Sequence, residues 1–124
     1  MNQLIVKNYT TGGAVGQRRI AKFGASDGLI VQAAAAADAL IGVVDTPGGA
    51  ASGTRADIVH LGITEVEFGG AVTRGGWVTA DADGKAVAPA PAAGANVRVV
   101  GFALASAVSG DIGLIFVLPG QIQG

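Results

Sequence analysis

Residues Arg74–Gly120, RGGWVTADADGKAVAPAPAAGANVRVVGFALASAVSGDIGLIFVLPG, decide the fold. They contain a turn at Asp83-Gly84 and two long apolar segments, Val97–Leu104 and Asp111–Leu118, which the polar turn Ser109-Gly110 joins. Both segments are mostly Val, Ile, Leu and Phe with little alternation between apolar and polar residues, so they predict strands that are covered on both faces. Because the chain has only 124 residues, we expect another copy of the protein to supply one covering layer.

The rest of the sequence predicts an all-β fold. Its 21 glycines and closely spaced turn signals are typical of a small β-barrel or β-sandwich. We expect at most one short Ala-rich helix, at Ala33–Ala39, because alanine is the best helix former but so short a run needs tertiary contacts. Residues 1–17 mix short apolar pieces with glycine and predict a flexible, extended N-terminal arm. Residues 18–124 then form a single β domain.

An internal repeat predicts that this domain is built from two similar β-units. Turns and glycines of the first half recur in the second half at a nearly constant spacing. The matched pairs are Asp27-Gly28 with Asp83-Gly84, Leu40–Val43 with Val99–Phe102, Ser52-Gly53 with Ser109-Gly110, and Asp57–Leu61 with Leu114–Leu118. Glycines and turns carry the comparison because their backbone requirements are specific. Chance similarity in a chain rich in Ala and Gly is the alternative.

Composition favours an oligomer and excludes several kinds of function. Half of the residues are apolar and 14% are charged, which leaves apolar surface for a subunit or partner interface; an Ala-rich monomer is the alternative. The net charge is −1, and the densest basic group, Lys7 with Arg18, Arg19 and Lys22, is too small to bind nucleic acid. No cysteine is present, which excludes disulfides and cysteine-based zinc sites. The sequence shows neither a secretory signal nor a membrane-spanning run, so we expect synthesis in the cytoplasm and no membrane partner.

The titratable residues predict no catalytic, cofactor or metal site. His60 is the only histidine and lies in an apolar segment, with no second histidine to share a metal ion. Asp81-Ala82-Asp83-Gly84 begins like a calcium loop, but the twelfth position, where glutamate is needed, is Ala92. Glu65 and Glu67 lie two residues apart and are explained by the solvated side of a strand. We therefore expect a structural protein and not an enzyme.

A series of glycine-based motifs extends through both halves. They are Gly75-Gly76-Trp77-Val78-Thr79-Ala80-Asp81, Gly84-Lys85-Ala86-Val87, Val100-Gly101-Phe102-Ala103, Ser109-Gly110-Asp111 and Phe116-Val117-Leu118, with Ile41-Gly42-Val43-Val44-Asp45 and Gly62-Ile63-Thr64-Glu65-Val66 in the first half. Over residues 18–120 the chain resembles the small capsid decoration (cement) proteins of tailed bacteriophages; Ala33–Ala39 and the loop Thr46–Thr54 depart from that pattern. The resemblance implies a β-rich, usually trimeric protein that binds the major capsid protein on the outer surface of the head and stabilises the shell.

Under this resemblance we predict that the N-terminal arm binds the shell by adding itself to an exposed strand edge of the major capsid protein. Its contact residues are Asn2, Leu4, Val6 and Tyr9. Trp77 follows a glycine pair and is interpreted either as a core residue or as an interface anchor.

Two other functions stay open. The chain could be another virion component, namely a head-fibre base or a tail-tube subunit. A more distant alternative is a trimeric β-barrel nucleotide hydrolase with a site shared between subunits, for which Tyr9, Arg74 and Asp81 are the available residues. Their spacing matches no such enzyme family.

Overall fold

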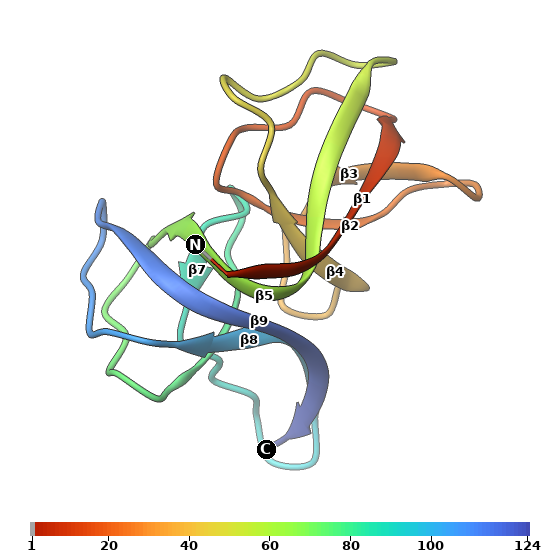
Figure 1. Cartoon of the computed structure of the whole chain (residues 1–124). Coiled ribbons are helices and arrows are strands. Elements are labelled where there is room, and N and C mark those ends of the chain that lie inside the picture. Colours follow the sequence, from red (N-terminus) through yellow and green to blue (C-terminus); the bar gives the residue numbers. More distant parts are fainter. Residues whose placement is uncertain (1) are drawn as a thin grey trace.

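The computed structural model describes residues 2–124, in which the chain forms nine strands and no helix (Figure 1). The strands are β1 (Gln3–Thr11), β2 (Ile20–Phe23), β3 (Leu29–Gln32), β4 (Leu40–Val44), β5 (Arg55–Glu67), β6 (Trp77–Ala80), β7 (Ala86–Val87), β8 (Asn96–Ala103) and β9 (Ile112–Gln123). They belong to one mixed sheet. The prediction of an all-β fold is confirmed.

The first unit consists of β1 to β4 and the first half of β5, and these strands form a closed ring. β2 pairs with β3 and β4, and β4 pairs with β5, in each case antiparallel. β1 closes the ring, because it pairs in parallel with β3 and antiparallel with β5. Small and branched side chains fill the interior: Val15, Ala21, Ile30, Ile41, Val44, Ala56 and Ile58.

The second unit, formed by the second half of β5 and by β6 to β9, repeats this arrangement strand for strand. The order β3-β2-β4-β5 corresponds to β7-β6-β8-β9. The second half of β5 takes the place of β1: it pairs antiparallel with β9, and Phe68 just after it forms a parallel bridge to β7. The bridge between Val15 and Ala50 likewise corresponds to that between Val72 and Ala107. Figure 1 shows the two units side by side, with β5 running from one into the other. The prediction of two similar β-units is confirmed.

The structure corrects the prediction of a flexible arm over residues 1–17. Residues 3–11 are the ring strand β1, and Val15 lies in the interior with 5% of its surface exposed. The physical reason is that β2 to β5 leave one edge of β3 and one edge of β5 unpaired, and only β1 joins these edges. Met1 lies outside the described residues.

Ala33–Ala39 contains no helix, although this run is the helix candidate of the sequence. The carboxylate of Asp38 accepts hydrogen bonds from the backbone N–H groups of Ala34 and Ala35, at 2.9 and 3.0 Å, and pairs with Lys22. This local bonding offers the backbone an alternative to helical hydrogen bonds. The carbonyl of Ala36 accepts from the N–H of Arg98 at 2.8 Å, which ties the turn to the second unit.

A second buried cluster fills the second unit and also holds the two units together. Its interior part contains Val66, Phe68, Val72, Val78, Ala86, Val100, Ala103, Ala107 and Ile115. The same cluster includes Ile20, Leu40, Val43 and Val59 of the first unit. These four lie on the outer face of the first ring, because their strand neighbours belong to the interior cluster. The outer face of the first unit is therefore buried against the second unit.

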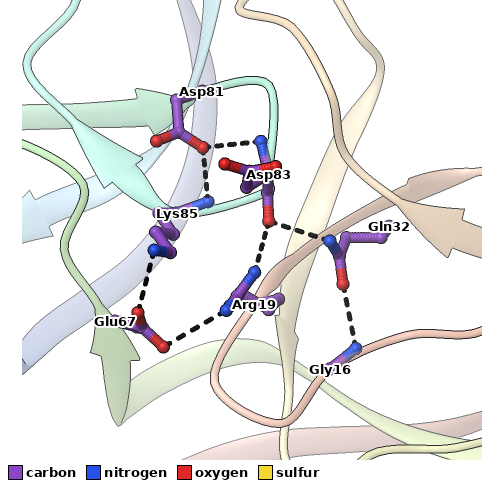
Figure 2. A network of polar contacts seen from close by, with 7 residues as sticks. All are labelled: Gly16, Arg19, Gln32, Glu67, Asp81, Asp83 and Lys85. Atoms are coloured by element: carbon purple, nitrogen blue, oxygen red, sulfur yellow. Dashed lines mark hydrogen bonds and ion pairs between the residues drawn. The ribbon is translucent and has the colours of Figure 1, made fainter. Parts of the chain in front are cut away.

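A polar network joins the units at the edge of this interface (Figure 2). Arg19 donates from Nη1 to the carbonyl oxygen of Asp83 at 2.8 Å and pairs with Glu67 Oε1 at 3.4 Å. Lys85 Nζ lies 3.2 Å from Glu67 Oε2, and Gln32 donates to the same Asp83 carbonyl at 2.8 Å. Burial raises the pKa of Glu67, but the hydrogen bond from Lys85 and the charge of Arg19 outweigh it, so this pKa lies below its ordinary value. Glu67 is charged at neutral pH and bridges the two cations.

Gly42 and Gly101 occupy equivalent positions in the two units, each beside a shift in strand register. A Cβ atom on Gly42 would overlap the carbonyl oxygen of Val59, and one on Gly101 would overlap that of Phe116. Neither glycine has a positive φ. Space at the partner strand, and not backbone conformation, is what requires glycine here.

We predict that Gly42→Ala and Gly101→Ala each lower the free energy of unfolding by about 3 kcal/mol, because the strand must move away from its partner. Denaturant unfolding followed by circular dichroism measures the change. Gly13→Ala is the matched control, since nothing lies within 4 Å of a Cβ at Gly13. Equal stability of all three variants would contradict the close approach described here.

Candidate interaction surfaces

The first half of β1 presents apolar side chains to solvent. Leu4, Ile5 and Val6 expose 66%, 53% and 45% of their surface. β1 pairs with β5 along Gln3–Thr10, but it pairs with β3 only through Thr10 and Thr11. Within residues 2–124, its other edge over residues 3–8 has no strand partner, so this segment combines a free strand edge with exposed apolar side chains.

Asn2 and Gly62 explain why β1 begins where it does. The N–H of Ile63 donates to the carbonyl of Asn2 at 2.8 Å. Gly62 has a φ of 116°, and a Cβ there would collide with backbone atoms of Asn2 and Leu4. Only glycine allows both this backbone conformation and this approach. Asn2 thus contributes a backbone contact to β5, and Leu4, two residues later, contributes an exposed side chain.

Tyr9 is held within the first unit. Its hydroxyl lies 2.7 Å from Nε2 of His60, and the two ring centroids are 5.5 Å apart. The ammonium group of Lys7 lies over the Tyr9 ring, 4.5 Å from its centroid. Burial raises the pKa of Tyr9. Burial and, to a smaller extent, the charge of Lys7 lower the pKa of His60. Tyr9 therefore differs from Leu4 and Val6, which have free side chains.

Trp77 lies on the outer face of the second unit with 42% of its surface exposed. It is the first member of a cross-strand row: it pairs with Phe102, which pairs with Phe116, which pairs with Ile63. Trp77 and Phe102 meet edge to face at 5.9 Å between centroids, and Phe102 stacks on Phe116 at 5.6 Å. We call the row of Trp77, Phe102 and Phe116 the aromatic row. Trp77 is thus not a core residue of the chain.

The outer face of β9 extends this apolar surface. Ile112, Leu114 and Leu118 expose 45%, 39% and 44% of their surface, while Ile115 and Val117 between them are fully buried. The sequence prediction that Asp111–Leu118 is covered on both faces is therefore met on one face only within a single chain. Ile5, Phe102 and Phe116 are surface residues that were not predicted from the sequence, whereas Trp77 was. The alignment of the two halves pairs Val43 with Phe102 and contained a signal for this surface.

The acidic side chains and an open pocket are the other features of the structure that could form a site. Among residues 2–124, no group of three or more His, Asp or Glu side chains is placed to hold a metal ion. The carboxylate of Asp81 accepts from the N–H groups of Asp83 and Lys85 in its own turn. An open pocket of about 260 Å³ is lined by Leu40, Arg98, Pro119, Gly120 and Gln121. Arg98 is its one ionisable residue. Over the same residues, no helix could cross a membrane.

The chain matches no protein-family model and no curated protein. Its structure is similar to the crystal structure of the head fiber gp8.5 N base in bacteriophage phi29, with a TM-score of 0.65 and 19% sequence identity. The similarity covers 92% of this chain and 93% of that chain. It shows that the two chains share a fold over nearly their whole length. The resemblance to the decoration family stays a prediction.

We predict that the free energy of unfolding decreases between pH 7.5 and pH 5.5. Because the pKa of His60 is lower in the folded chain than in the unfolded chain, protonation of its imidazole favours unfolding. The contribution of His60 to stability is therefore fully present above the ordinary pKa of 6.5 and declines as the pH falls below it. Solvent screening keeps the decrease below about 1 kcal/mol. NMR titration of the single histidine measures its pKa directly, and Lys7→Gln should raise that pKa. A His60 pKa at or above 6.5 would contradict the prediction.

Proposed function

We propose that this chain is a non-enzymatic structural protein of a tailed-bacteriophage virion, which binds the outer surface of the head as an oligomer and stabilises the shell. The observation that carries the proposal is the shared fold with a head fiber protein over 92% of the chain. The glycine-based motifs that resemble the capsid decoration proteins support the same location. The partner we propose is the major capsid protein.

The exposed apolar surfaces suit such a role. A free-standing monomer rarely keeps large contiguous apolar patches in contact with water. This chain exposes apolar side chains in two places, at Leu4–Val6 on the first unit and at Trp77 of the aromatic row on the second. Two surfaces allow one contact with the shell and one with a sister subunit. Repetition over many equivalent sites of a head then turns modest single contacts into tight attachment.

We assign the shell contact to the first half of β1. Its free edge offers unpaired N–H and C=O groups, and Leu4, Ile5 and Val6 offer apolar side chains beside them. A strand of the major capsid protein can add to such an edge. Because β1 is already part of the first ring, the shell contributes the added strand, whereas the sequence predicted a flexible arm in that role. Tyr9 keeps β1 in place through its contact with His60.

A second candidate function is the base of a head fibre, and the fold shared with the head fiber gp8.5 N base favours it specifically. Both candidates bind the head, but they differ in what the bound protein carries. Electron microscopy of virions labelled with an antibody to this chain separates them. Label over a smooth shell supports a decoration protein, and label at the foot of a projecting fibre supports a fibre base.

We predict that Leu4→Thr combined with Ile5→Thr weakens binding to expanded empty heads at least about tenfold, because two exposed apolar contacts are lost while strand propensity is kept. Co-sedimentation of the purified protein with heads gives the bound fraction. Val108→Thr is the matched control, since Val108 is 58% exposed but lies outside β1. Unchanged binding of the double variant would remove the shell contact from β1. Failure of the unmodified chain to bind heads would contradict the proposed function.

A further inference from the structure

A row of three side chains on the outer face of the first unit is completely buried. Ile20 pairs with Val43 and Val43 pairs with Val59, and each has 0% of its surface exposed. The second unit covers this row from within the same chain. Its β6–β7 turn lies directly on β2, where the N–H of Ile20 donates to the carbonyl of Gly84 at 2.8 Å. The contact between the second unit and the first thus shows how one unit can cover the outer face of another.

The aromatic row occupies the corresponding positions in the second unit. Trp77, Phe102 and Phe116 lie on β6, β8 and β9, the counterparts of β2, β4 and β5, and they pair in the same order. The next strand is also equivalent in the two rows: Val59 pairs with Val6 of β1, and Phe116 pairs with Ile63 in the second half of β5, which is the counterpart of β1. Within residues 2–124 no third unit follows, so nothing in the chain covers the aromatic row as the second unit covers the first.

The surface that does the covering also has a free counterpart. In the second unit it includes the Asp83-Gly84 turn, which contacts Ile20 and which Ala80, the last residue of β6, leads into. The corresponding turn of the first unit, between β2 and β3, is Asp27-Gly28, and it is exposed. Phe23 occupies the place of Ala80 and exposes 54% of its surface. The chain therefore displays a partly exposed row on the second unit and an exposed turn with Phe23 on the first, and the carbonyl of Gly28 in this turn already accepts from the N–H of Thr10 at 3.1 Å.

We infer that a second copy of this chain covers the aromatic row, with Phe23 and the Asp27-Gly28 turn placed as the second unit places its own turn on the first. The contact joins two different surfaces, so it runs head to tail and closes into a ring when the rotation allows. The partner is thus a second copy rather than the capsid protein. The inference rests on the proposed function in that it supplies the contact surfaces of the oligomer proposed there. It can be tested with the purified protein alone, without phage heads.

The side chains of the aromatic row are larger than those of the buried row, as a contact between separate molecules requires. Within one chain, β5 holds the units together and the row consists of Ile and Val. Association of separate molecules loses translational and rotational freedom, which must be offset by a larger contact. Trp and Phe at the equivalent positions supply more buried area, and Phe replaces Ala on the opposite surface. Aromatic residues of this kind dominate the energetics of protein interfaces.

The test is the association of the purified chain and two single variants, Trp77→Thr and Phe23→Thr, measured by sedimentation velocity over a range of concentrations. Each variant should weaken self-association roughly tenfold or more, because each removes one side of the same contact. Val108→Thr changes an exposed apolar residue outside both surfaces and should associate like the unmodified chain. Circular dichroism verifies that each variant is folded.

Mixing the two variants distinguishes a head-to-tail contact from a symmetric one. Each variant retains the surface that the other lacks, so an equimolar mixture should form one-to-one dimers and nothing larger. A monomeric unmodified chain at millimolar concentration would overturn the inference. A defect in Trp77→Thr without one in Phe23→Thr, or a mixture that stays monomeric while the unmodified chain associates, would overturn it as well. If instead the chain associates as expected but does not bind heads, the proposed function fails and the self-contact stands.

Discussion

The structure depends on β5, a strand of 13 residues that belongs to both units. Its first half pairs with β1 and β4 and completes the first ring, and its second half pairs with β9 and begins the second ring. The change of partner occurs at Gly62, where a positive φ and the close approach of β1 both require glycine. Because one continuous strand sets the relation between the units, the outer face of the first ring is always placed against the second. That placement explains why the row of Ile20, Val43 and Val59 is buried while the aromatic row is not. It also brings together the residues of the polar network around Glu67.

Much of this architecture could be predicted from the glycines and turns. Gly42 and Gly101 each face a carbonyl of the neighbouring strand, and that strict requirement is why their match revealed the repeat. β1 could not be found in this way, because its counterpart is the second half of β5, which the sequence presents as the end of one strand and not as the start of a unit. The Ala33–Ala39 run misled for another reason: helix propensity is weak compared with the bonds that Asp38 makes to its own turn.

The candidate surfaces were harder to predict than the fold. Leu4 and Val6 are exposed as an arm residue would be, but they belong to a paired strand, so their exposure results from the free edge and not from mobility. Apolar character alone did not distinguish Phe116 from Ile115, although one is half-buried on the outer face and the other is fully inside. Only the ring geometry assigns the two faces of β9. Comparison of equivalent positions then adds what composition cannot: the same row is covered in one unit and open in the other.

The two rings depend on each other because β5 runs through both and because an apolar face is buried between them. Two units of this kind joined by a loop could be separated by a protease or at a gene boundary and still fold, as independent domains do. Here a cut in β5 at Gly62 would leave each ring its own half of the strand, but separating the rings would expose Ile20, Val43 and Val59, which the second unit buries. The molecule thus has two similar halves that fold as one body, because neither half can be removed without exposing the apolar face between them.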